Sequence, residues 1–213
     1  MNQINLENYF DKGFDLFKLP DNIIKKLWLI LQDTKWIRDP DNTYKSIPIW
    51  YNSEGVIYQS QDSGGDRDVV ERIYGKSLLE KCPKNIIEIA YNIINLNFFD
   101  PLRFFKKQTE LKYIHLWNGA EEIPWHMDTV DGSDTLLLIY LTEQTDWDNN
   151  WGGCVGLRKE LSNEIKHEIL IQPLSGNTIV INNANPLVKH RVYKLKNTNI
   201  NRYTLSLCFN WST

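Results

Sequence analysis

The second half of the chain is a succession of short apolar or alternating runs that are separated by turn residues. Pairs such as Asn118-Gly119 and Asp131-Gly132 stand in the breaks, which leave no room for helices. Short runs bounded by such residues predict strands, and eight strands at close spacing predict two facing sheets, a jelly roll. The predicted strands are residues 111–117, 123–126, 135–141, 154–158, 168–172, 178–182, 188–195 and 203–211.

The last of these runs has two different faces. Every second residue from 203 to 211 is large and apolar, whereas the residues between them are polar or small. Because side chains alternate between the two faces of a strand, one face is expected to pack on a core and the other to line a polar interior. Arg202, Thr204 and Ser206 are predicted to face this interior.

The first half of the chain has helical periodicity. Apolar residues recur every three to four positions in residues 22–32 and 77–95, so each segment predicts a helix with one buried face. Asp21 is placed to cap the first helix. Pro101 is expected to end the helical section.

The remaining N-terminal segments show weaker hydrophobic periodicity. Residues 1–18 are mixed, with phenylalanines at helix-like spacing, and short strands are predicted at 47–51 and 56–58. Residues 59–68 are polar and Gly-rich, which predicts a loop that is a candidate for a lid over a site. No catalytic signature stands in residues 1–110.

Together these patterns predict an α+β fold that is mainly β: a double-stranded β-helix (jelly roll) with supporting N-terminal helices. Residues 1–110 are expected to form the helical support with short strands, and residues 111–213 the core. A chain of 213 residues fits one compact domain of this kind.

Composition limits the partners and the compartment. The formal net charge is −3 and no long basic run occurs, so nucleic acid is not expected as a partner. The longest apolar run, residues 136–141, is too short to span a bilayer, and no signal peptide is evident. The three cysteines have no paired spacing, which favours reduced thiols and a cytoplasmic location.

The candidate chemistry begins with His126-Met127-Asp128 at the end of the second predicted strand. In an extended chain His126 and Asp128 share one face and can bind one metal ion. His190, in the seventh strand, offers a third ligand. Two His and one carboxylate have the composition of the facial triad of non-haem Fe(II) oxygenases. A His-x-Asp pair alone occurs often by chance, and a lone strand His is more often structural; the combination carries the prediction. His167, in a polar hairpin, is expected to be exposed.

Arg202 is the candidate anion anchor. A guanidinium that points into a closed interior needs a partner, and its planar fork suits a carboxylate. Thr204, on the same face, can donate a second hydrogen bond, and the phenol of Tyr140 a third. The alternatives are a salt bridge between Arg202 and a protein acid, and ordinary strand packing for Tyr140.

These motifs resemble the iron(II)/2-oxoglutarate-dependent dioxygenases, in particular the prolyl 4-hydroxylase-like branch. The resemblance covers the C-terminal half in order and spacing, and residues 1–110 match only as helical support. It implies that His126, Asp128 and His190 hold Fe(II), and that Arg202, assisted by Tyr140 and Thr204, holds the C5 carboxylate of 2-oxoglutarate, with O2 as the oxidant. The matching segments are residues 125–128, 135–141, 151–153, 190–192 and 202–205.

The chain departs from the branch in three places. The gap from His190 to Arg202 is slightly longer than usual, and Arg202 places the chain with the members that use Arg instead of Lys. Cys154 and Val155 stand where a Glu-Leu pair often follows the two glycines. The departure at Cys154 and Val155 affects the expected substrate-binding surface and not the metal site.

The resemblance implies hydroxylation of an unactivated C–H bond, with a prolyl residue of a peptide or protein as the first substrate. A free amino acid or small metabolite is the alternative substrate. A nucleic-acid demethylase fits less well, because the net charge of the chain is negative. Two other classes remain open: a cupin-like metal-binding protein that does not use 2-oxoglutarate, and a non-catalytic jelly-roll module. Arg202 distinguishes a cupin-like protein from a 2-oxoglutarate-dependent enzyme, because in the absence of a co-substrate Arg202 should pair with a protein acid.

Overall fold

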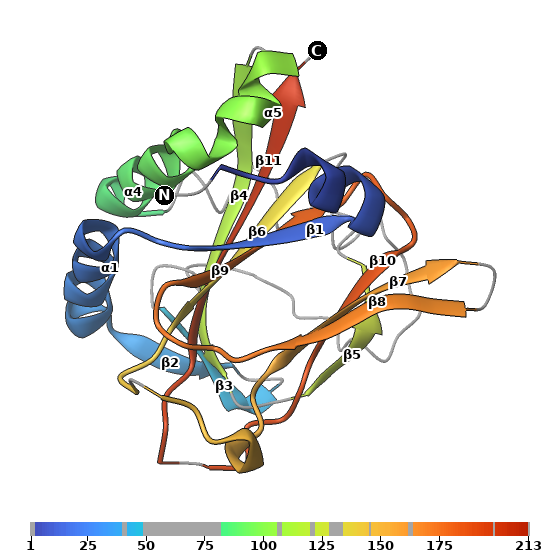
Figure 1. The fold of residues 1–213 in the computed structure, drawn as a ribbon. Helices are drawn as coiled ribbons and strands as arrows, with labels where there is room; N and C mark the ends of the chain where they lie inside the picture. The colour runs from blue at the N-terminus through green and yellow to red at the C-terminus, as the bar shows by residue number, and fades with distance from the viewer. Residues whose placement is uncertain are drawn as a thin grey trace.

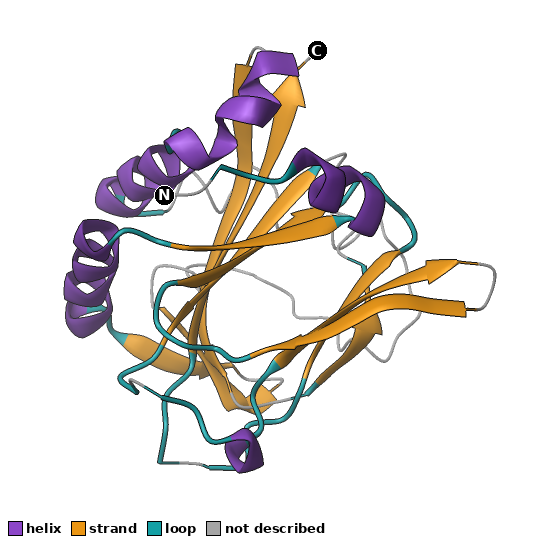
Figure 2. Cartoon of the chain, viewed as in Figure 1, coloured by secondary structure: helices purple, strands orange, loops and turns teal. Residues whose placement is uncertain are grey.

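The computed structural model describes residues 3–39, 42–48, 82–105, 108–119, 122–127, 134–144, 146–161, 164–197 and 199–212. Within these residues the strands form two antiparallel sheets that face each other across a buried interior (Figures 1 and 2). The fold is therefore α+β, mainly β, and a jelly roll, as predicted.

The larger sheet has seven strands in the order β1-β9-β6-β11-β4-β3-β2. At its centre lie β6 and β11, which are paired antiparallel from Thr135 to Leu141. The strands of this sheet are β1 (Phe14–Lys18), β2 (Trp36–Asp39), β3 (Asn42–Pro48), β4 (Gln108–Gly119), β6 (Thr135–Leu141), β9 (Asn177–Asn182) and β11 (Tyr203–Ser212).

Among the described residues, the smaller sheet has four strands in the order β5-β10-β7-β8, so β5 and β8 are the edges of this part. Its strands are β5 (Ile123–His126), β7 (Val155–Leu161), β8 (Glu164–Ile171) and β10 (Val188–Val192). The eight strands predicted after residue 110 are all confirmed, with shifts of a few residues at some ends. His167 is exposed on β8, as predicted, and it has a positive φ of 54°.

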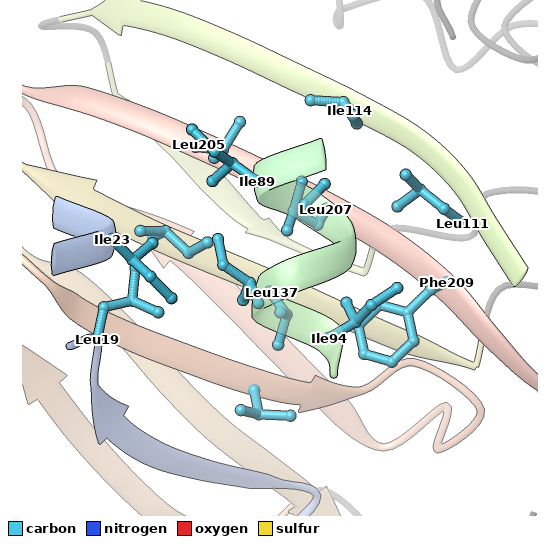
Figure 3. Packing of buried hydrophobic residues seen from close by; sticks show 14 of the residues in the cluster. Leu19, Ile23, Ile89, Ile94, Leu111, Ile114, Leu137, Leu205, Leu207 and Phe209 are labelled. Carbon is cyan, nitrogen blue, oxygen red and sulfur yellow. The ribbon is translucent and has the colours of Figure 1, made fainter. Parts of the chain in front are cut away.

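Helices cover the outer face of the larger sheet (Figure 1). The apolar side chains of α1 and α4 pack against Leu137, Leu205 and Leu207 of the sheet (Figure 3). This burial follows from the 3.6-residue apolar period of both helices. In the described part of the chain the helices are α1 (Asp21–Asp33), α4 (Lys84–Ile94) and α5 (Asp100–Phe105), with the short π or 3-10 helices η1 (Asn8–Lys12), η3 (Asn97–Phe99) and η4 (Asn149–Trp151).

Several N-terminal predictions need correction. Asp21 is the first residue of α1 and makes no capping bond, because Pro20 occupies the cap position. Pro101 does not end the helical section but stands in the first turn of α5, where its missing N–H needs no partner. Residues 14–18, which showed helix-like spacing, form β1. The described part of the second predicted helix begins at Lys84, after Pro83.

Other predictions fall partly outside the described residues. Those at 56–58 and 59–68 lie wholly outside, and so do residues 77–81 of the second predicted helix. The strand predicted at 47–51 begins earlier, as β3. The division of the chain at residue 110 stays a prediction, although β1, β2 and β3 belong to the larger sheet.

The two faces of β11 contribute to two separate cores. Leu205, Leu207 and Phe209 pack under the helices, whereas Cys208 joins the cluster between the sheets. Thr204 and Ser206 lie on the Cys208 side and are 3 % exposed. The predicted alternation is therefore confirmed, and the side chains between the sheets include polar groups.

Cys82, Cys154 and Cys208 are buried and form no disulfide within the described residues. Burial raises the pKa of the Cys82 thiol to about 12. In the part of the chain that the structure describes, no helix has the length and apolarity that crossing a bilayer requires.

A buried polar network joins the N-terminal segment to the larger sheet. The hydroxyl of Thr135 lies 2.6 Å from the Tyr9 hydroxyl and accepts a hydrogen bond from Trp211 Nε1 at 3.0 Å. Tyr9 also donates to the carbonyl of Asp134 at 3.2 Å. Burial raises the pKa of Tyr9 above its usual range, so the phenol stays protonated.

Replacement of Thr135 by Val is expected to lower the free energy of unfolding by about 2–3 kcal/mol, because it leaves the buried Trp211 N–H without an acceptor and weakens the Tyr9 contact. Urea denaturation measures the change. Thr135→Ser keeps the hydroxyl and should retain most of the stability. Equal stability of Thr135→Val and the wild type would show that the network is not stabilising.

Candidate active site

The register of β5 and β10 brings the two predicted histidine ligands together. His126 and His190 are directly opposed Cα partners in the antiparallel pair, and their ring centroids lie 4.1 Å apart at an interplanar angle of 54°. His190 is 3 % exposed and shares one face of β10 with Val188 and Val192, which pack between the sheets. Its ring therefore lies on the interior face of the smaller sheet.

A backbone carbonyl orients the His126 ring. Nδ1 of His126 lies 2.7 Å from the carbonyl oxygen of Pro124. A carbonyl can only accept, so Nδ1 donates in this bond, and in the neutral ring Nε2 carries the lone pair. This is the arrangement by which metal-binding histidines are commonly fixed. Pro124 is compatible with the strand because β5 is an edge.

Asp128 lies outside the described residues. Within the described residues, no three His, Cys, Asp or Glu side chains gather as a metal site, and the pair of histidines stands as two of the three predicted ligands. The role of Asp128 as the carboxylate ligand stays a prediction.

Arg202 is buried where the larger sheet begins its last strand. It is 5 % exposed, and its Nη1 donates to the carbonyl of Gly153 at 2.8 Å and to that of Tyr193 at 3.4 Å. Its Nε is buried and has no partner in the part of the chain that the structure describes. Burial lowers the pKa of Arg202, while the nearby Tyr140 and Cys154 act to raise it; an arginine remains charged at neutral pH.

This charge has no neutralising acid among the described residues, since both hydrogen-bond partners of the guanidinium are neutral carbonyls. A buried and uncompensated cation is costly in free energy. The alternative of a salt bridge to a protein acid therefore finds no support within the described part of the chain. The site around Arg202 is suited to an anionic ligand.

Tyr140 and Thr204 lie beside this anchor. They are directly opposed Cα partners on β6 and β11, and they are 1 % and 3 % exposed. Thr204 follows Arg202 by two residues, so the strand geometry places both on one side of the sheet. The structure thus brings Arg202, Tyr140 and Thr204 together as predicted; their role as ligand donors stays a prediction.

The two glycines after Trp151 make room for the Arg202 anchor. Gly152 and Gly153 both have φ of 71°, a conformation that a side chain rarely adopts. A Cβ on Gly152 would lie 2.1 Å from the carbonyl oxygen of Lys194, and one on Gly153 would lie 3.0 Å from Leu195. The two glycines therefore allow their backbone to approach residues 194–195 closely, and this places the Gly153 carbonyl within hydrogen-bonding distance of Arg202.

Two features of the site were missed by sequence reasoning. The carbonyls of Gly153 and Tyr193 hold Arg202, and backbone acceptors carry no signal in the sequence. Ser206 lies on the interior face that the alternation of β11 predicts, and its buried Oγ has no partner among the described residues. The hydroxyl is therefore available to a ligand between the sheets.

A separate cleft of about 730 Å³ opens on the outer side of the larger sheet. Trp28 and Leu31 of α1, together with Glu143 and Tyr203, are among its lining residues. None of the predicted site residues lines it, and Tyr203 projects from the sheet face opposite to Thr204. This cleft is distinct from the predicted site.

Searches of protein-family models and of curated proteins find no match. Solved structures do match. A prolyl 4-hydroxylase from Pseudomonas putida is 14% identical, with a TM-score of 0.50, over 98% of this chain and 97% of that one. A Trichoplax adhaerens prolyl hydroxylase in complex with a hypoxia inducible factor peptide fragment is 13% identical, with a TM-score of 0.54, over 97% and 87%.

HygX from Streptomyces hygroscopicus, solved with nickel, 2-oxoglutarate and hygromycin B bound, is 11% identical, with a TM-score of 0.56, over 96% of this chain and 85% of that one. At such identities the likeness concerns the fold. The resemblance predicted from the sequence motifs is confirmed at that level, and it extends over nearly the whole chain.

Proposed function

We propose that this chain is an Fe(II)/2-oxoglutarate-dependent oxygenase that hydroxylates an unactivated C–H bond. The observation that carries the proposal is the buried Arg202 guanidinium, which has no acid partner among the described residues. The guanidinium lies near Tyr140, which belongs to the apolar cluster between the sheets, and His190 is buried on the face of β10 that contributes Val188 and Val192 to the same cluster. A metal-chelating dicarboxylate is the ligand that would join the two sites.

The residues present fit this cofactor set. Nε2 of His126 and the ring of His190 would bind the metal with Asp128, and two His with one carboxylate leave three positions open. Arg202 would hold the far carboxylate through a charge-assisted pair, with the hydroxyls of Tyr140 and Thr204 as further donors. HygX, which shares the fold, binds nickel and 2-oxoglutarate, and this supports the assignment.

When bound, Fe(II) and 2-oxoglutarate supply the oxidative chemistry, in which 2-oxoglutarate, O2 and R–H give succinate, CO2 and R–OH. The chain itself positions the groups. The Pro124 carbonyl fixes the His126 tautomer, and apolar side chains such as Leu157 and Val188 exclude water from the interior. Arg202, which is fixed by the carbonyls of Gly153 and Tyr193, would hold the carboxylate of the co-substrate that does not chelate the metal.

The proposed substrate is a prolyl residue in a peptide or protein. The likeness to a prolyl hydroxylase in complex with a peptide supports it. A small molecule is the second candidate, and the comparable likeness to HygX with bound hygromycin B supports that reading. A cupin-like protein that does not use 2-oxoglutarate is disfavoured, because Arg202 would then require a protein acid.

The test is conversion of 2-oxoglutarate to succinate by the purified protein with Fe(II) and ascorbate, in the presence of candidate prolyl peptides and of free amino acids. Mass spectrometry identifies the product by the gain of one oxygen atom. Succinate that forms with a peptide and not with small molecules supports the prolyl assignment, and the opposite pattern supports the small-molecule class. Failure to produce succinate with any candidate contradicts the proposed function.

A further inference from the structure

Trp125, the residue before the ligand His126, is packed on the outer face of the smaller sheet. Strand geometry sends Trp125 and His126 to opposite faces. The indole lies under the guanidinium of Arg158, whose Cζ is 4.0 Å from the centroid of the ring. This distance is typical of a cation–π contact. Trp125 thereby reaches from β5 across β10 to β7.

Gly156 on β7 provides the space for this indole. A Cβ on Gly156 would lie 2.8 Å from Cη2 of Trp125 and 3.3 Å from Cε2 of Tyr193. Gly156 does not have a positive φ, so its backbone conformation does not require glycine. The close approach of the Trp125 ring does.

Arg158 is itself held in place above the ring. Its guanidinium is ion-paired with Glu160 and its side chain is only 17 % exposed. Glu160 also binds Lys189 at 2.6 Å, and Lys189 is the Cα partner of Arg158 on β10. The cation over the indole is thus part of a network that spans the two inner strands of the sheet.

The backbone alone attaches β5 weakly. The strand is four residues long, and among the residues that the structure describes it is an edge that pairs with β10 alone. Its register contains two pairs, His126–His190 and Ile123–Val192, with an irregularity between them. Few backbone hydrogen bonds fix the orientation of such a short and irregular strand relative to the sheet. Side-chain packing, here that of Trp125, is needed to fix it.

We propose that Trp125, Gly156 and Arg158 form a clamp that positions His126 for metal binding. The proposal rests on the proposed function, since it assigns His126 as a metal ligand. The clamp residues do not touch the metal. They fix the outer side of β5, so that the imidazole on the inner side keeps its place opposite His190.

The test is metal affinity measured separately from folding. Co2+ is titrated into the full-length protein and followed by its visible absorption, while thermal unfolding is recorded without metal. Gly156→Ala and Trp125→Ala are expected to weaken Co2+ binding by about 10–100-fold, the range typical of residues that support a ligand. Trp28→Ala is the matched control, because it removes a half-buried indole from α1 on the far side of the larger sheet; its Co2+ affinity should stay within about threefold of the wild type.

A double-variant cycle gives the sharper readout. Phe at position 125 lacks the Cη2 atom that an alanine at position 156 would strike, so Gly156→Ala should weaken Co2+ binding much less in the Trp125→Phe background than in the wild type. Wild-type affinity in both Gly156→Ala and Trp125→Ala would overturn the clamp and leave the proposed function intact. A wild-type protein that binds no Co2+ would instead overturn the proposed function, and the clamp with it.

Discussion

Replacement of Arg202 by Met is expected to weaken binding of 2-oxoglutarate to the metal-loaded protein by about 30-fold or more. Removal of one partner from a buried charge pair costs about 2–5 kcal/mol, which corresponds to a loss of about 30- to 4,000-fold in affinity. In the protein, Arg202 is 5 % exposed and is fixed by the carbonyls of Gly153 and Tyr193. Titration calorimetry with 2-oxoglutarate and the Ni2+-loaded protein measures the loss.

Arg103→Met is the matched control for this variant. Arg103 also donates to two backbone carbonyls, those of Ile94 and Leu96, but it lies on α5, outside the interior. Its loss should leave 2-oxoglutarate affinity unchanged. If Arg202→Met and Arg103→Met bind 2-oxoglutarate equally well, the assignment of Arg202 as the carboxylate anchor is wrong.

Replacement of His190 by Ala is expected to lower metal affinity by at least about 1,000-fold and to remove succinate formation. Loss of a residue that merely supports a ligand costs about 10–100-fold in metal affinity, so loss of a direct ligand should exceed that. Alanine lacks the imidazole ring, whose centroid lies 4.1 Å from that of His126. Co2+ titration and the succinate assay report the two effects separately.

His167→Ala serves as the control, because His167 is exposed on β8 and lies outside the predicted site. It should match the wild type in both assays. Metal binding that survives in His190→Ala would contradict the assignment of His190 as a ligand, and circular dichroism would show whether the variant keeps the fold.

The core of the fold was predictable because its signal is local. Alternation in β11 assigned Leu205 and Leu207 to one core and Thr204 and Ser206 to the interior, and the structure agrees. Turn residues marked the breaks between the strands after residue 110. Such patterns depend only on the period of the side chains and need no knowledge of distant partners.

The N-terminal predictions failed where a local signal has two meanings. Pro101 predicts a helix stop, yet proline also fits the first turn of a helix, as in α5. Asp21 has the chemistry of a cap, but Pro20 already occupies that position. The spacing of Phe14 and Phe17 indicated a helix, whereas pairing of β1 with β9 made the segment a strand. That pairing joins residues far apart in the sequence, and no local pattern reports it.

The sequence predicts which side chains form the site, but not the contacts that support them. The antiparallel register of β5 and β10 explains why His126 and His190 meet, whereas the roles of both histidines and of Arg202 stay predictions. The carbonyls that hold Arg202 and the indole that supports β5 depend on three-dimensional contact. Even Gly156, which is required by the Trp125 ring, looks like any other strand glycine in the sequence.

The central claim is that one 2-oxoglutarate molecule joins the histidine metal site to Arg202. The most direct measurement is calorimetric titration of 2-oxoglutarate into Fe(II)-loaded protein without O2. We predict one site per chain, with binding that is tightened by the metal and weakened in both Arg202→Met and His190→Ala. Absence of binding to the wild-type protein, or binding that neither variant changes, would contradict the account.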